Sequence, residues 1–313
     1  MDEDNWNILC QLWDDDELSL RFGAHFLIVP TDSAEADAAQ VDRAKELAQK
    51  YKLGNDPKLW IAGIKIICDG VVDGCTAALT HPYLSNGKSV PPIWTPERLR
   101  NVLEKADTAG LQCALHAIGD AAVHLAVEGL ASLGSAGRRH RIEHLELTSP
   151  EDAKRLGELG ITASVQPVHL DPEQSTVWPP LIGHDACKRA FAYREFFDHG
   201  ARLAIGSDAP TAPHPAFNNL FNAVTRRSFR RPDEEDQLNP QFALDLNDAL
   251  ASTSYWAAYS CFAEDFIGGL REGKKADFII VDSTDDWDTE PSSILKCEVS
   301  ETWLNGKRVY ISV

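Results

Sequence analysis

The 313-residue sequence lacks any long apolar run and any surplus of basic residues. Its most apolar segment, residues 59–68, is interrupted by Lys65 and is much shorter than the roughly 20 residues that a membrane-spanning helix needs. Lysine and arginine number 30 against 48 aspartate and glutamate residues, which gives a formal charge of −18. Because an acidic surface repels phosphate, we expect no membrane partner and no nucleic-acid partner.

Closely spaced cysteine pairs are also missing. The seven cysteines are scattered and include no C-x-x-C pair, which disfavours a disulfide framework and a cysteine-based zinc site. Residues 1–6 are acidic and do not resemble a secretion signal. These absences predict a reducing compartment, the cytoplasm. Apolar residues make up 43% of the chain, which is enough for a folded core.

Short apolar runs alternate with helical patterns along most of the chain. We expect helices over 33–51 and after Thr95 and Ser149, since each of the last two precedes a proline and an acid, which is typical of a helix start. This order predicts an α/β fold of strand-helix units around a parallel sheet. The six expected buried strands are 24–29, 59–68, 111–116, 140–144, 161–166 and 203–207.

The C-terminal part has a different texture. We expect one helix over 247–262, then turn-bounded strands at 277–282 and within 299–311. The segment 170–186 is expected to form a loop over the mouth of the sheet structure, and the charged stretch 226–236 a solvated loop. Six strand-helix units are too few to close an eight-stranded barrel.

Four polar residues lie at or just beyond the C-terminal ends of separate predicted strands, the edge at which barrels carry out chemistry. They are Lys65, His116, His144 and Asp208. Two imidazoles and a carboxylate suit a metal centre, and a lysine amine can take up carbon dioxide to become an anionic carbamate, which resolves the cost of burying its charge. Each also has a structural alternative: a core histidine, a salt-bridged lysine or a turn-capping aspartate.

Five short motifs follow one another in chain order, and with them the sequence resembles the metal-dependent amidohydrolase superfamily, in particular its amidohydrolase-3, YtcJ-like group. A sixth motif resembles the segment at which such chains return from the barrel to a composite β-sandwich. The motifs are IKIICDG (64–70), HAIGD (116–120), RIEH (141–144), QPVH (166–169), GSDAP (206–210) and GLREGKKADFIIVD (269–282).

The resemblance implies a partial TIM-type (β/α)8 barrel over residues 1–265 and a C-terminal β-sandwich portion over 266–313. It also implies that Lys65, carboxylated, His116, His144 and Asp208 hold one or two divalent metal ions, by default zinc. In this reading Asp208 is the catalytic acid-base residue. Positions that match group-typical residues near the substrate, with turn or hydrogen-bonding roles as the alternative, are Asp69, Asp120, Gln166 and His169.

One feature of the superfamily is absent from the sequence. No two histidines are separated by a single residue, whereas the first barrel strand of the superfamily ends in a His-x-His pair. His25 falls early in what would be the third strand and does not replace that pair. We therefore expect an N-terminally incomplete chain, which an upstream in-frame segment encoding His-x-His in genomic DNA would confirm.

The function implied by the resemblance is hydrolysis of an amide-like, non-peptide C–N bond in a small molecule by a metal-activated water. Two alternatives stay open. One is deamination or cyclic-amide opening by the same residues, and the other is a non-catalytic or unstable fragment of such an enzyme. A homo-oligomer is also left open.

Overall fold

The computed structural model describes residues 1–18, 20–54, 58–134, 137–283 and 286–312. It contains two compact units: Met1–Leu145 with Leu159–Ile161, and Glu146–Glu158 with Thr162–Val313. We call them unit 1 and unit 2 and describe each by itself. The division follows contact density within the chain, so the boundary predicted after residue 265 stays a prediction.

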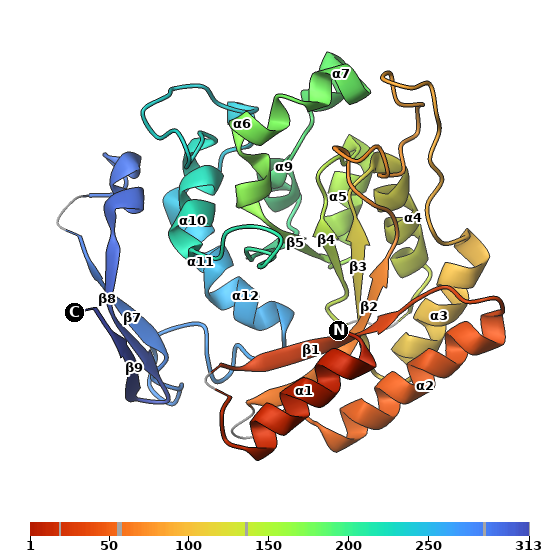
Figure 1. Ribbon diagram of the computed structural model, residues 1–313, viewed down its shortest axis with the longest axis horizontal. Coiled ribbons are helices and arrows are strands. Elements are labelled where there is room, and N and C mark those ends of the chain that lie inside the picture. Colours follow the sequence, from red (N-terminus) through yellow and green to blue (C-terminus); the bar gives the residue numbers. More distant parts are fainter. Residues whose placement is uncertain (19, 55–57, 135–136, 284–285, 313) are drawn as a thin grey trace. The chain divides into compact units, whose positions relative to one another are not determined.

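Unit 1 contains four parallel strands in chain order: β1 (Phe22–Ile28), β2 (Leu59–Ile67), β3 (Gln112–Ala117) and β4 (Arg141–His144). These bounds confirm the first four predicted strands to within two residues. Helices α2 (Ala34–Lys50), α3 (Pro96–Thr108) and α4 (Asp120–Ala131) pack beside the strands (Figure 1). β2 reads as a nearly continuous apolar run because most of its residues on both faces are buried.

The helix predicted over 33–51 and the two helix starts predicted at Thr95 and Ser149 are confirmed. Ser33 Oγ accepts the Ala36 N–H at 3.1 Å at the start of α2, and Thr95 Oγ1 accepts the Arg98 N–H at 3.4 Å at the start of α3. Ser149 Oγ likewise accepts the Asp152 N–H at 3.1 Å where α5 (Pro150–Glu158) begins. Each bond satisfies an amide that the helix itself leaves without an acceptor.

Helix α1 (Glu3–Asp14) has no counterpart among the predicted elements. Asp2 caps it by accepting the Asn5 N–H at 2.9 Å, and Trp6 and Leu9 are its buried residues. An i, i+3 spacing of two apolar residues after an N-cap is a helix signal, but the many acids around it obscured the pattern.

Unit 2 combines a parallel strand pair with a small antiparallel sheet. β5 (Thr162–Val165) pairs with β6 (Arg202–Ile205), which confirms the last two predicted strands. Helix α9 (Tyr193–Asp198) packs against β6 and α5, and α10 (Ala216–Thr225) follows β6 in the chain. β7 (Phe278–Asp282), β8 (Glu298–Leu304) and β9 (Lys307–Ile311) form the antiparallel sheet, as the alternating pattern predicted.

The prediction of a single helix over residues 247–262 is wrong. Two helices occupy the region, α11 (Leu246–Thr253) and α12 (Tyr255–Ser260), and Ser254 between them has φ −124° and ψ −81°. Its hydroxyl donates to Leu250 O at 2.6 Å. Serine side chains compete with the backbone for such acceptors, so the hydroxyl-rich stretch interrupts the helix.

The prediction of a loop over residues 170–186 is also wrong, because the segment is mostly helical. Pro167–Leu170 forms a 3₁₀ turn (η1), and three short helices follow: α6 (Pro172–Ser175), α7 (Trp178–Ile182) and α8 (His184–Cys187). Prolines stand in the first turn of η1, α6 and α7, where they need no hydrogen-bond acceptor. The prolines that suggested a loop therefore start helical turns.

The stretch 226–236 is not solvated throughout, since Arg226 is fully buried. Its guanidinium donates to the carbonyls of Leu238 at 2.7 Å, Phe191 at 3.0 Å and Ala190 at 3.3 Å, and it stacks on the Tyr193 ring. Burial lowers the pKa of Arg226 to about 10. This one side chain joins its own segment to two others in unit 2, residues 190–191 and Leu238.

Two further properties agree with the composition. All seven cysteines are free thiols, and burial raises the pKa of Cys68 and of Cys113 well above the ordinary value. Among the described residues, no helix combines the length and the apolar character that crossing a membrane requires.

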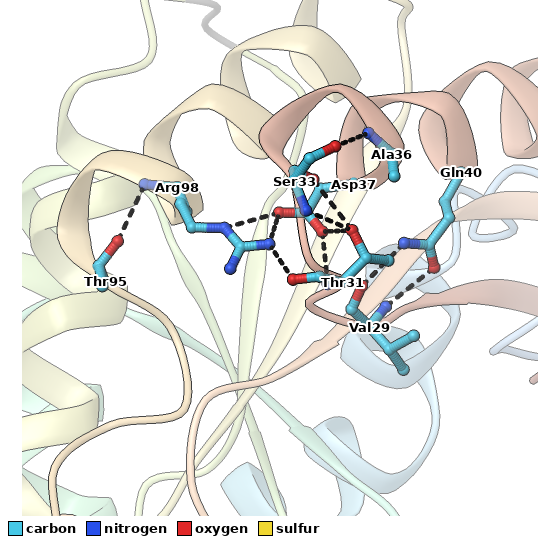
Figure 2. A network of polar contacts seen from close by, with 8 residues as sticks. All are labelled: Val29, Thr31, Ser33, Ala36, Asp37, Gln40, Thr95 and Arg98. Carbon is cyan, nitrogen blue, oxygen red and sulfur yellow. Dashed lines mark hydrogen bonds and ion pairs between the residues drawn. The ribbon is translucent and has the colours of Figure 1, made fainter.

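A buried ion pair connects α2 to α3 in unit 1 (Figure 2). Asp37, 1% exposed, accepts hydrogen bonds from the Thr31 amide at 2.7 Å and the Thr31 hydroxyl at 2.8 Å. Arg98 donates to its other oxygen from Nε at 2.9 Å and also from an Nη. Burial opposes the ionisation of Asp37, but these partners outweigh it and keep the pKa of Asp37 below 3.8.

We predict that Asp37→Ala lowers the free energy of unfolding by about 3 kcal/mol, because it leaves the partly buried Arg98 guanidinium without its carboxylate, with only the Thr31 carbonyl as acceptor. The matched control is Asp42→Ala, which removes an exposed carboxylate that also joins α2 to α3, through Lys105 at 2.6 Å. We expect that variant to cost less than about 1 kcal/mol. Denaturant unfolding at neutral pH measures both, and equal losses would contradict the assignment.

The same pair predicts a pH dependence. Because the folded-state pKa of Asp37 is depressed, its contribution is complete above about pH 4 and is lost as the pH falls through the folded-state value. The stability difference between the wild type and Asp37→Asn should therefore shrink below pH 4.

Candidate functional site

Two imidazoles lie together at the C-terminal ends of neighbouring strands in unit 1. His116 is on β3 and His144 ends β4, and their ring centroids are 4.4 Å apart with an edge-to-face angle of 66°. In the ladder His116 pairs with Glu143 and not with His144. His144 has φ 76°, outside the strand region, so its side chain does not follow the strand alternation. The left-handed backbone of His144 thus occurs where its ring contacts the ring of His116.

Lys65 lies on the same face of the sheet as His116. Its register partners are Leu27 on β1 and Ala114 on β3, and Ala114 precedes His116 by two residues. The lysine is half-buried, and the residue beside it on β3 is the small Ala114. Unit 1 therefore brings His116 and His144 together and places Lys65 on the face of His116.

Asp69 is completely buried beside His116. Its Oδ2 accepts the amides of Ala78 at 2.9 Å and Gly119 at 2.8 Å, and its Oδ1 accepts the Ile118 amide at 3.0 Å. The same Oδ1 is 3.5 Å from His116 Nε2. Asp69 thus contacts a predicted metal ligand, and it also holds two loops together.

Asp120 accepts two hydrogen bonds from Thr80, in the loop after β2. Its Oδ1 accepts the Thr80 amide at 3.0 Å, and the Thr80 hydroxyl donates to its Oδ2. This is the hydrogen-bonding role that stood as the alternative to substrate binding.

His25 is committed to a structural network on β1. Gln112 donates to Arg139 O at 2.6 Å, so its amide oxygen faces His25 Nε2 at 2.7 Å, and His25 must be the donor. Burial, followed by the positive charge of Arg141, lowers the pKa of His25 to about 3. The ring is therefore neutral at physiological pH.

This burial predicts an acid sensitivity. His25 takes up a proton below about pH 6.5 in the unfolded chain, but only near pH 3 in the folded chain. As the pH is lowered from 6.5 to 3, the free energy of unfolding should therefore fall by about 1.4 kcal/mol for each pH unit through this residue alone. His25→Gln keeps a donor for Gln112 and removes the titration, so its stability profile from pH 7 to pH 4 should be flatter. The exposed His81→Gln is the control, and a profile unchanged in His25→Gln would refute the prediction.

In unit 2, the imidazole of His169 lies between two carboxylates. Its Nδ1 is 3.2 Å from Glu146 Oε1, and its Nε2 is 3.9 Å from Asp208 Oδ2. Glu146 is buried, whereas the side chain of Asp208 is 38% exposed. The two acids face different ring nitrogens, so His169 bridges Glu146 and Asp208. The imidazole therefore cannot bind one metal ion together with both carboxylates in this arrangement. Asp208 has φ 58°, a second left-handed residue just after a strand.

Gln166, directly after β5, has an unsatisfied polar atom. Its Nε2 is 3.5 Å from Ser164 O, while its buried Oε1 has no hydrogen-bond partner within the described part of the chain. Buried polar atoms are nearly always paired, so this oxygen is a candidate acceptor for a ligand N–H.

Each unit by itself contains donor types that suit a divalent metal ion. Unit 1 has two neighbouring imidazoles, and unit 2 has carboxylates beside an imidazole; zinc and related metals bind both kinds of group. The sequence analysis missed Glu146, a buried acid two residues after His144. The position of Glu146, two residues after the predicted strand 140–144, could have indicated it as a site residue.

Comparison with known proteins identifies relatives over most of the chain. A sequence profile described as an amidohydrolase family matches residues 2–310. Protein LONG AFTER FAR-RED 3 of Arabidopsis thaliana is 34% identical over 257 residues, which cover 80% of this chain and 43% of that protein. The Bacillus subtilis protein YtcJ is 29% identical over 272 residues, which cover 86% of this chain and 50% of YtcJ.

A solved structure gives the same picture. The crystal structure of an uncharacterized metal-dependent hydrolase from Pyrococcus horikoshii has a TM-score of 0.72 and 27% identity to this chain, covering 88% of this chain and 53% of that one. The chain thus spans about half the length of the relatives it matches.

Proposed function

This chain belongs to the amidohydrolase family, and from that premise we propose that it acts in metal-dependent hydrolysis of a non-peptide C–N bond in a small amide-like molecule. The observation that carries the proposal is the edge-to-face pair of His116 and His144, 4.4 Å apart at the ends of adjacent strands. The similarity to a metal-dependent hydrolase of solved structure supports it. The free thiols favour a reducing compartment, the cytoplasm.

In this proposal His116, His144 and a carboxylated Lys65 hold one or two divalent ions, with zinc as the default, and Asp208 completes the ligand set. A bound ion would polarise the substrate carbonyl and lower the pKa of a water molecule toward about 7. Asp208 accepts the proton of the attacking water and delivers it to the leaving nitrogen. The partial TIM-type barrel belongs to the same proposal.

The remaining polar residues bind and position in this scheme. The buried Oε1 of Gln166 accepts a hydrogen bond from a substrate N–H, which provides the partner that it otherwise lacks. His169, held by Glu146 at 3.2 Å, restricts the orientation of the Asp208 carboxylate beside it.

Metal analysis of the purified chain tests the ligand set. We expect zinc to co-purify with the wild type or to bind on titration, and expect His116→Ala/His144→Ala to lose at least about tenfold in zinc affinity because two ligands are gone. His81→Ala removes an exposed imidazole of unit 1 and should bind zinc like the wild type. A double variant that retains wild-type affinity would refute the proposal.

The role of Asp208 predicts a separation of metal binding from turnover. Asp208→Asn keeps the shape of the side chain and an oxygen ligand but cannot accept the proton, so hydrolysis should fall by about 100-fold or more, with metal content nearly intact. Release of amine from a panel of N-acyl amines, formamides and cyclic amides measures turnover. Unchanged turnover in Asp208→Asn would exclude the acid-base role.

A further inference from the structure

The buried carboxylate of Asp69 is surrounded by hydrogen-bond donors from two segments. One is the loop after β2, through the Ala78 amide, and the other is the turn that follows His116, through the amides of Ile118 and Gly119. Three amide hydrogen bonds of 2.8–3.0 Å satisfy a charge that would otherwise be costly to bury. The backbone that carries His116 is thereby tied directly to Asp69.

His116 Nε2 faces two hydrogen-bond acceptors. Gly70 O is 3.2 Å away and Asp69 Oδ1 is 3.5 Å away. A ring nitrogen between two acceptors must carry the proton, because its lone pair would otherwise face theirs. In the neutral ring the lone pair then lies on Nδ1, which is the nitrogen that can bind a metal.

We infer that Asp69 is a positioning residue for His116: together with Gly70 O it fixes the Nε2–H tautomer and the orientation of the ring, so that Nδ1 is presented to the metal. The inference rests on the proposed function for the identity of the ligand. It assigns Asp69 to the support of the metal site and not to contact with the substrate.

A purely structural role for Asp69 can be separated from this one, because the same loop has a second attachment. Thr80 donates from its amide and its hydroxyl to Asp120, and the acceptors beside His116 belong to two other residues, Gly70 and Asp69. Thr80→Val therefore weakens the junction between the loop and the turn, and leaves the acceptors beside His116 in place.

The first experiment reads the tautomer of His116 in the metal-free, 313-residue wild-type chain. Long-range ¹H–¹⁵N correlation spectra of ¹⁵N-histidine-labelled chain, assigned with His116→Gln, distinguish protonated from unprotonated ring nitrogens. We expect a protonated Nε2 and an unprotonated Nδ1 at neutral pH. An Nδ1–H tautomer would overturn the inference, and this readout requires no variant of Asp69 to fold.

The second experiment compares zinc binding by Asp69→Asn, Thr80→Val and the wild type, by competition with a chromophoric chelator. In Asp69→Asn the remaining oxygen can keep the amides of Ala78 and Gly119, which places the new NH2 group beside the Ile118 amide and His116 Nε2. An NH2 group donates to a ring nitrogen that carries no proton, so we expect a mixed His116 tautomer and a 10- to 100-fold loss of zinc affinity. Thr80→Val should change neither. A folded Asp69→Asn chain with wild-type affinity and tautomer, or equal losses in both variants, would overturn the inference.

The two proposals fail in different ways. A wild-type chain that binds no zinc contradicts the proposed function, and the tautomer of the metal-free chain still decides whether Asp69 holds His116 as inferred. A wild-type chain that binds zinc through His116 in the Nδ1–H form supports the metal site and contradicts the role of Asp69.

Discussion

A charge buried without water must find all its partners within the protein, and the Asp69 carboxylate meets this constraint with three backbone amides. Two of those amides follow His116 in the chain, so the position of the imidazole depends on a residue from the neighbouring strand-helix unit. Gly119 allows the close approach, since a β-carbon there would lie 2.1 Å from Ala78 O. His116, Asp69 and Gly119 are therefore held in place by the same set of contacts.

Regular strand geometry accounts for the positions of Lys65 and His116, whereas His144 and Asp208 depart from it. Parallel strands bring Lys65 and His116 to one face through alternation. His144 and Asp208 are both non-glycine residues with left-handed backbone, φ 76° and 58°, each at the end of or just after a strand. Such conformations are energetically unfavourable and tend to persist at functional sites, which agrees with their place in the proposed ligand set.

The strands of both units were predictable because apolar runs carry a local signal, and two helix starts were predictable because Thr95 and Ser149 each precede a proline and an acid. Features that depend on distant contacts were not. The break at Ser254, the burial of Arg226 by three remote carbonyls and the bridge from Glu146 to His169 arise from packing that no local pattern records. The family motifs suggested the site residues that we propose, whereas no motif indicates the hydrogen bonds by which Asp69 holds the turn after His116, because they join segments far apart in the sequence.

The central claim is that His116 and His144 bind one metal ion together. X-ray absorption spectroscopy at the zinc edge of the zinc-loaded, 313-residue chain tests it most directly, because imidazole rings give a characteristic multiple-scattering pattern. The account predicts about two imidazoles per zinc, with nitrogen and oxygen ligands at about 2.0–2.2 Å. A shell of sulfur scatterers at about 2.3 Å, or a spectrum without imidazole scattering, would contradict it.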